Sequence, residues 1–161
     1  MPLRLAVLLV ALLALGACVG PRVDLSRPPA SGPVAVDAAA AARMVSAVRA
    51  QHGLGPVSVD PDLNRLAQQQ ANAMAAAGVV GHDILAGFSS RMGGRYLLAA
   101  ENLGAGYVSL AHGMEAWTAS RPHLRNLLRP DIVSIGIASA YSASSPYRNF
   151  FAMILAGPPV P

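Results

Sequence analysis

The chain has 161 residues, enough for one domain, and 53% of them are hydrophobic while 12% are charged. All 12 basic residues are arginine, they are scattered along the chain, and the formal net charge is only +4. No basic run alternates with aromatic residues, so we expect no nucleic-acid partner and only weak, non-specific attraction to an anionic surface.

Residues 1–17 have the anatomy of a signal peptide. Arg4 precedes the apolar run LAVLLVALLAL, which is too short to span a bilayer. The following LGAC resembles the lipobox of bacterial lipoproteins, which implies cleavage before Cys18 and lipidation of that residue. The alternative is an ordinary secretory signal followed by a chance cysteine. The lipobox interpretation predicts secretion across the inner membrane and a lipid anchor at Cys18.

Residues 18–36 are predicted to form a tether. They contain four prolines and show no helical period, which is typical of an extended linker. Residue 19 is valine rather than aspartate, so the sorting rules of such lipoproteins predict the outer membrane or periplasm if the host has two membranes. Because Cys18 is the sole cysteine, no intramolecular disulfide is possible, and residues 37–161 must form a domain that is stable through its core alone.

Two helices open this domain. Asp37 is a good N-cap for a helix over 37–53, and Asp60, followed by Pro61, is a good N-cap for a helix over 60–78. A glycine stands at the end of each stretch, as expected for a helix C-terminus.

The second half is predicted to contain one more helix and then strands. The helix covers 109–120 and is ended by Pro122. Residues 96–100 form a short strand or the end of a turn. Residues 132–140 alternate as in a half-buried strand, and residues 149–157 are apolar on both faces, as in a central strand covered by helices. Helices followed by antiparallel strands predict an α+β layered domain.

Three ionisable residues stand where predicted elements end. His82 follows the second helix, Glu101 follows the apolar run 96–100, and His123 follows the third helix. Two imidazoles and a carboxylate can form the first shell of zinc. Glu101 could instead orient one of the imidazoles without binding metal. A third interpretation is that the two histidines are unrelated surface residues.

Five stretches resemble, in the same order, segments of the CAP or SCP-like family (cysteine-rich secretory proteins, antigen 5 and pathogenesis-related 1), in its short, cysteine-free bacterial branch. The first four are the two-helix block from AVRAQHG onward, GHD with His82, AENLGAG with Glu101 and Asn102, and WTASRPHLRNLL with Trp117, Ser120, His123 and Asn126. The fifth is the closing pair SIGIA and FFAMILA. The resemblance covers roughly residues 42–156. It implies a three-layer α-β-α sandwich with a small antiparallel sheet and a cleft.

In many eukaryotic members of this family, two histidines and two glutamates line the cleft. Carried over to this chain, the resemblance places His82, Glu101 and His123 together, with Asn102 beside them. The fourth position falls on Ser120, so one carboxylate is missing and a four-residue acid/base centre is not intact.

These observations leave several functions open. The first is an envelope-anchored binding module whose His82–Glu101–His123 cleft holds a divalent metal, a small ligand or an envelope protein. The alternative is a zinc-dependent hydrolase, a peptidase or esterase, with zinc on His82 and His123 and Glu101 as general base. A third is lipid binding between helices, as reported for some eukaryotic members. The sequence does not identify the ligand or the partner.

Overall fold

The computed structural model describes residues 32–161, so the predicted signal peptide, Cys18 and most of the predicted tether lie outside the described residues. Within this range the helices are α1 (Ala38–Ala50), α2 (Pro61–Ala77), α3 (Phe88–Met92), α4 (Leu110–Ala119) and α5 (Arg121–Leu127). The strands are β1 (Ser58–Val59), β2 (Ala99–Ala105), β3 (Ser134–Tyr141) and β4 (Asn149–Ala156). No helix of residues 32–161 is long and apolar enough to cross a membrane.

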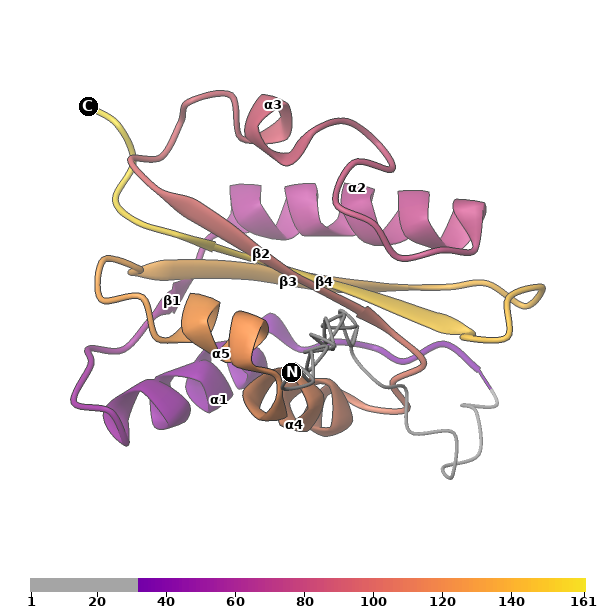
Figure 1. Ribbon diagram of the computed structural model, residues 1–161, viewed down its shortest axis with the longest axis horizontal. Coiled ribbons are helices and arrows are strands. Elements are labelled where there is room, and N and C mark those ends of the chain that lie inside the picture. Colours follow the sequence, from indigo (N-terminus) through magenta and orange to yellow (C-terminus); the bar gives the residue numbers. More distant parts are fainter. Residues whose placement is uncertain (1–31) are drawn as a thin grey trace, which may run out of the picture.

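The four strands form one mixed sheet between two helical layers. Their order is β1-β3-β4-β2, and β4 is antiparallel to both of its neighbours. Helices α2 and α3 cover one face of the sheet, and α1, α4 and α5 cover the other (Figure 1). The predicted α-β-α sandwich is therefore confirmed. The sheet is not wholly antiparallel, because β1 pairs with β3 in parallel.

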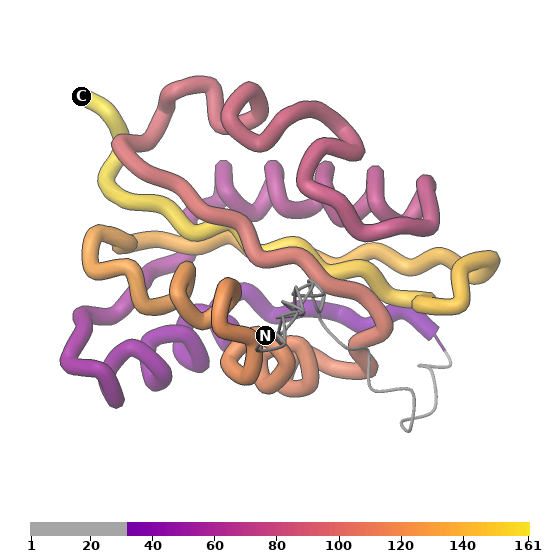
Figure 2. Tube along the Cα trace, in the orientation of Figure 1, coloured from indigo at the N-terminus to yellow at the C-terminus, as the bar shows by residue number. Residues whose placement is uncertain are grey.

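Strand β4 is buried on both faces, as its sequence predicts. Phe150 and Ile154 pack with α2 on one side, while Phe151 and Met153 belong to the core under α1, α4 and α5. All four side chains are fully buried. The tube trace shows this strand crossing the middle of the molecule between the two layers (Figure 2). A continuous apolar strand therefore indicated the centre of the sheet.

The predicted caps of the first two helices are present. The Asp37 carboxylate accepts a hydrogen bond from Ala39 N–H at 2.8 Å, and the Asp60 carboxylate accepts one from Asp62 N–H at 2.8 Å. Gly78 ends α2 in the left-handed conformation, with φ of 71°. Local hydrogen bonding thus determines where these helices begin and end.

Three segments differ from the sequence-based expectation. AENLGAG forms most of β2, so Glu101 lies inside a strand rather than after a short run. The predicted helix over 109–120 does end before Pro122, because α4 stops at Ala119, but a further helix, α5, begins at Arg121. A proline in the first turn of that helix loses no helical hydrogen bond. The region after His82 contains the five-residue helix α3, which its sequence did not predict.

The residues just before α1 lie against the domain. Val34 and Val36 pack on the core beneath α1, α4 and α5. Val34 N–H donates to the Asn149 side chain at 2.9 Å, and the Ser139 hydroxyl donates to the Val34 carbonyl. The part of the predicted tether that the structure describes is therefore packed onto the sheet.

Candidate functional site

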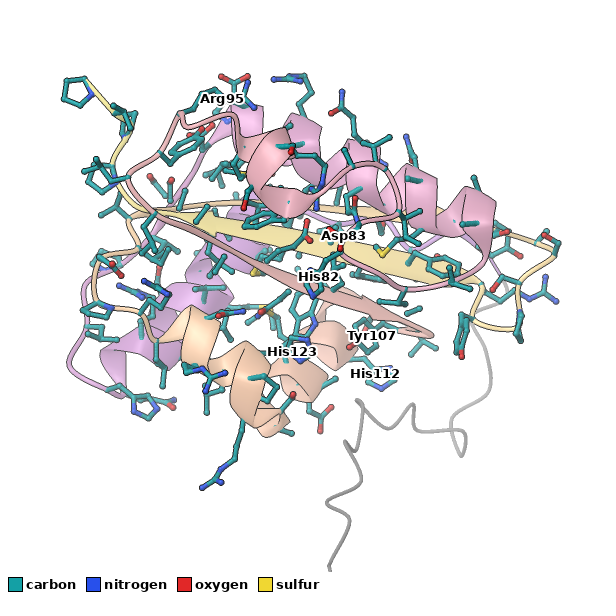
Figure 3. The ribbon with its side chains drawn as sticks, turned by 45° about the horizontal axis from the view of Figure 1, so that its top comes forward. His82, Asp83, Arg95, Tyr107, His112 and His123 are labelled. Carbon is teal, nitrogen blue, oxygen red and sulfur yellow. The ribbon has the colours of Figure 1, made fainter. Side chains whose placement is uncertain are left out.

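The predicted site residues come from both helical layers and from the strand between them. His82 lies in the turn after α2, Glu101 lies in β2 at the edge of the sheet, and His123 lies in α5. The imidazoles of His82 and His123 lie near each other beside β2 (Figure 3), close enough for charge on His82 to influence His123. The fold therefore brings these three distant residues to one place.

The Glu101 carboxylate is the buried centre of this cluster. Its side chain is 1% exposed, whereas the His82 side chain is 57% exposed. His82 Nδ1–H donates to Glu101 Oε2 at 2.8 Å. Glu101 therefore fixes the ring of an otherwise exposed histidine and leaves its Nε2 free to face solvent.

Arg91, at the end of α3, is the cluster residue that the sequence analysis missed. Its Nη2 lies 2.9 Å from Glu101 Oε1 and 3.0 Å from Oε2, and its side chain is 4% exposed. The same nitrogen donates to the His82 carbonyl at 3.0 Å, and Nε donates to the Ala86 carbonyl at 3.0 Å. Arg91 thus neutralises Glu101 and ties down the loop that carries His82.

A second set of contacts positions His123. The Ser120 hydroxyl lies 2.9 Å from His123 Nδ1. Asn102 donates to the His123 carbonyl at 3.1 Å, and Asn126 donates to Asn102 Oδ1 at 2.9 Å and to the Glu101 carbonyl at 3.3 Å. Because Asn102 and Glu101 are adjacent in β2, this amide network connects α5 to the strand that carries the carboxylate.

The surroundings shift the pKa values of the two imidazoles in opposite directions. The hydrogen bond to Glu101 raises the pKa of His82, although partial burial and the charge of Arg91 oppose it. Burial lowers the pKa of His123, and the charge of nearby His82 lowers it further. As pH falls, His82 therefore takes up a proton before His123.

The donor set does not suit a metal held by all three predicted ligands. Zinc sites in proteins use three or four protein ligands. Both Glu101 oxygens already accept hydrogen bonds from the Arg91 cation, and no group of three His, Cys, Asp or Glu side chains within residues 32–161 is arranged to hold a metal. Of the predicted ligand atoms in the described part of the chain, the Nε2 atoms of His82 and His123 remain available.

Ser120 and His123 do not form a nucleophilic triad. In such a triad the serine contacts one imidazole nitrogen, and an acid orients the other. Here Ser120 contacts Nδ1 of His123 within the same turn, while the carboxylate of Glu101 contacts His82 instead. Ser120 therefore orients His123 rather than acting as its nucleophile.

A separate apolar groove of about 420 Å³ lies between α1 and α4. It is lined by Met44, Ala47, Val48, Ala111, Met114, Glu115 and Thr118. The groove residues belong to α1 and α4, whereas His82 lies in the turn after α2 and His123 lies in α5. The groove and the polar cluster are thus two distinct features of the domain.

Comparison with known proteins identifies the family. Residues 42–155 match the model of the cysteine-rich secretory protein family, also called CAP. The chain belongs to the CAP family. No curated protein matched the chain.

Solved structures with the same CAP fold include several from bacteria. An outer surface protein from Borrelia burgdorferi superposes with a TM-score of 0.65 at 18% identity, over 76% of this chain and 96% of that protein. An extracellular SCP-domain protein from Bacillus anthracis gives 0.65 at 19% identity, over 74% of this chain and 39% of that one. The venom allergen-like protein 4 of Schistosoma mansoni gives 0.52 at 12% identity, over 76% and 88%. At such identities the similarity establishes the fold.

Proposed function

We propose that this CAP domain is a non-catalytic binding module held at the cell envelope. The observation that carries the proposal is the state of Glu101, which is buried and bound to both Arg91 and His82. A carboxylate held in this way is a poor general base, because taking up a proton would break a charged pair. The Nε2 atoms of the two imidazoles remain available to bind a polar group of a ligand.

The ligand is a small molecule or an envelope protein that places a polar group between His82 and His123. Envelope glycans and peptides should be screened by the shift they cause in the melting temperature of the purified protein. The shift should disappear in His82→Ala and in His123→Ala and persist in His52→Ala, a histidine beyond the end of α1. If both site variants respond like the wild type, the ligand does not bind at this cleft.

The same samples separate binding from catalysis. Turnover of any envelope peptide, glycan or ester, lost in His82→Ala, would contradict a non-catalytic module. If that activity also disappears with a chelator and returns with zinc, the zinc-dependent hydrolase is the correct alternative. Glu101 would then have to leave the Arg91 pair to act as general base.

Anchoring to the membrane is supported by the LGAC stretch and by the neighbours of this fold. Two of these are described as an outer surface protein and an extracellular protein. We expect the full chain in the membrane fraction, and we expect Cys18→Ser to shift it to the soluble fraction. An unchanged distribution of the Cys18→Ser variant would refute the lipid anchor.

The lipid-binding alternative is supported by the groove between α1 and α4. Its lining is mostly apolar, and Glu115 lies at the same site. Lipid bound there would be displaced by Ala111→Trp, which fills the groove, but not by His82→Ala. Mass spectrometry of extracts from the purified protein tests this, and an empty groove in the wild type would remove the alternative.

A further inference from the structure

We propose that Arg91 is a specificity-determining residue that keeps divalent metal ions out of the cleft, by holding the Glu101 carboxylate in a buried ion pair. The proposal concerns the selectivity of the cleft proposed above and does not depend on which ligand it binds. The resemblance to the CAP family implies a possible metal at the two histidines and this carboxylate. The donors in this chain do not fit that group, and Arg91 is the reason.

Both oxygens of the Glu101 carboxylate already accept hydrogen bonds. One guanidinium nitrogen of Arg91 lies within hydrogen-bond distance of both Glu101 oxygens, and His82 Nδ1–H uses Oε2 as well. A zinc ion would have to approach one of these oxygens to about 2.0–2.2 Å. It would then stand close to the fixed positive charge of the buried Arg91 guanidinium.

Arg91 is also held in place by contacts other than its ion pair with Glu101. Its Nε and Nη2 donate to the carbonyls of Ala86 and His82, and its guanidinium carbon lies over the Phe88 ring, 5.3 Å from the ring centre. Its remaining nitrogen, Nη1, is buried without a hydrogen-bond partner among residues 32–161. Within residues 32–161 Glu101 is the anionic partner of Arg91, and displacing the arginine would also release the loop of His82.

Without Glu101, the cleft offers a metal ion the nitrogens of two imidazoles. Two imidazole nitrogens are fewer than the three protein ligands of a catalytic zinc site and the four of a structural one. The hydroxyl of Ser120, where many family members carry a second carboxylate, is taken up by His123 Nδ1. The cleft therefore lacks an unpaired carboxylate that could complete a metal site.

The test is zinc affinity of the full-length protein in detergent, measured by isothermal titration calorimetry. Arg91→Gln removes the charge but keeps an amide that can donate to the buried carboxylate, so the fold is retained more readily than with an apolar residue. Arg91→Lys keeps the charge. Arg65→Met, on the exposed face of α2, is the control for loss of an arginine elsewhere.

We expect wild type, Arg91→Lys and Arg65→Met not to bind zinc stoichiometrically at equal micromolar concentrations. Arg91→Gln should bind it at least about tenfold more tightly than wild type, the scale on which changes around a metal site alter affinity. The gain should vanish in Arg91→Gln/Glu101→Gln. Equal affinity in wild type and Arg91→Gln would overturn the proposal. Stoichiometric zinc on the wild type would overturn it even if the variants do not fold. Failure to find an envelope ligand would not change these zinc affinities. The proposal of a binding module and the proposal of metal exclusion by Arg91 can therefore fail independently.

Discussion

Replacing Arg49 by methionine should destabilise the domain strongly. Arg49 lies in the last turn of α1, is 1% exposed, and donates four hydrogen bonds to backbone carbonyls. The acceptors are Gly55, Leu127 and Arg129 at 2.8 Å and Ile132 at 3.0 Å. The bonds to Leu127 and Ile132 are fully buried, and a buried acceptor left without a donor costs about 1–3 kcal/mol, so these two alone predict a loss of about 2–6 kcal/mol.

Such a loss is a large share of the stability of an ordinary domain, about 5–15 kcal/mol. Urea denaturation followed by circular dichroism measures it, with Arg43→Met as the matched control on the same helix. The Arg43 side chain is 72% exposed, and its ion pair to Asp37 at 4.0 Å is also exposed, so its loss should change stability by no more than about 0.5 kcal/mol. A loss below about 1 kcal/mol for Arg49→Met, or equal losses in both variants, would refute the reasoning.

Two further changes test the site and the packing. Glu101→Gln should lower the pKa of His82 in an NMR titration, while exposed Glu115→Gln should leave it unchanged; an unaltered His82 in Glu101→Gln would mean that the carboxylate does not hold the ring. Because the folded state raises the pKa of His82, this group stabilises the fold at pH values below about 6.5, its unfolded value. That contribution disappears as pH rises through the folded pKa, so Glu101→Gln should reduce this part of the pH dependence. Gly136→Ala should cost about 3 kcal/mol or more or prevent folding, because its methyl carbon would lie 2.0 Å from backbone of α2. Gly55→Ala, with open space around it, should be nearly neutral in the same urea assay.

The elements that the sequence predicted well are those determined by neighbouring residues. Asp37 and Asp60 bond to N–H groups two or three positions ahead, so the start of each helix is specified within one turn. Strand β4 was also recognisable, because a run buried on both faces contains almost no polar residue. In these cases local chemistry and the final fold agree.

Strand β2 was harder to predict because its conformation depends on a distant partner. AENLGAG contains glycine, alanine and a carboxylate, residues that do not favour strands. It is extended because each residue from Ala99 to Ala105 pairs with β4, about fifty positions later. The position of Glu101 in the middle of a strand, buried between two helical layers, follows from that pairing and could not be read from the local sequence.

Arg91 had no signal in the sequence for a related reason. It belongs to a helix of five residues, too short for a hydrophobic period, and its anionic partner lies ten positions away in another element. Only the resemblance to the CAP family brought His82, Glu101 and His123 together in advance, and it contained nothing about position 91. The charge that completes the site therefore emerged from the fold alone.

The absence of a second carboxylate, at position 120, changes what the cleft can attract. With serine at position 120, the cluster contains the carboxylate of Glu101 and the guanidinium of Arg91, whose formal charges cancel. Neutral histidines add nothing to this sum, and protonated ones make it positive. The buried pair itself therefore offers a cation no net attraction, although the negative charge of Asp83 also acts on His82. A neutral or anionic group, in contrast, can accept hydrogen bonds from the imidazoles. The electrostatics of the cleft thus favour a polar ligand over a metal ion, and the comparison of Arg91→Gln with Arg91→Lys isolates this effect, since both variants alter the shape of the site and one alone alters its charge.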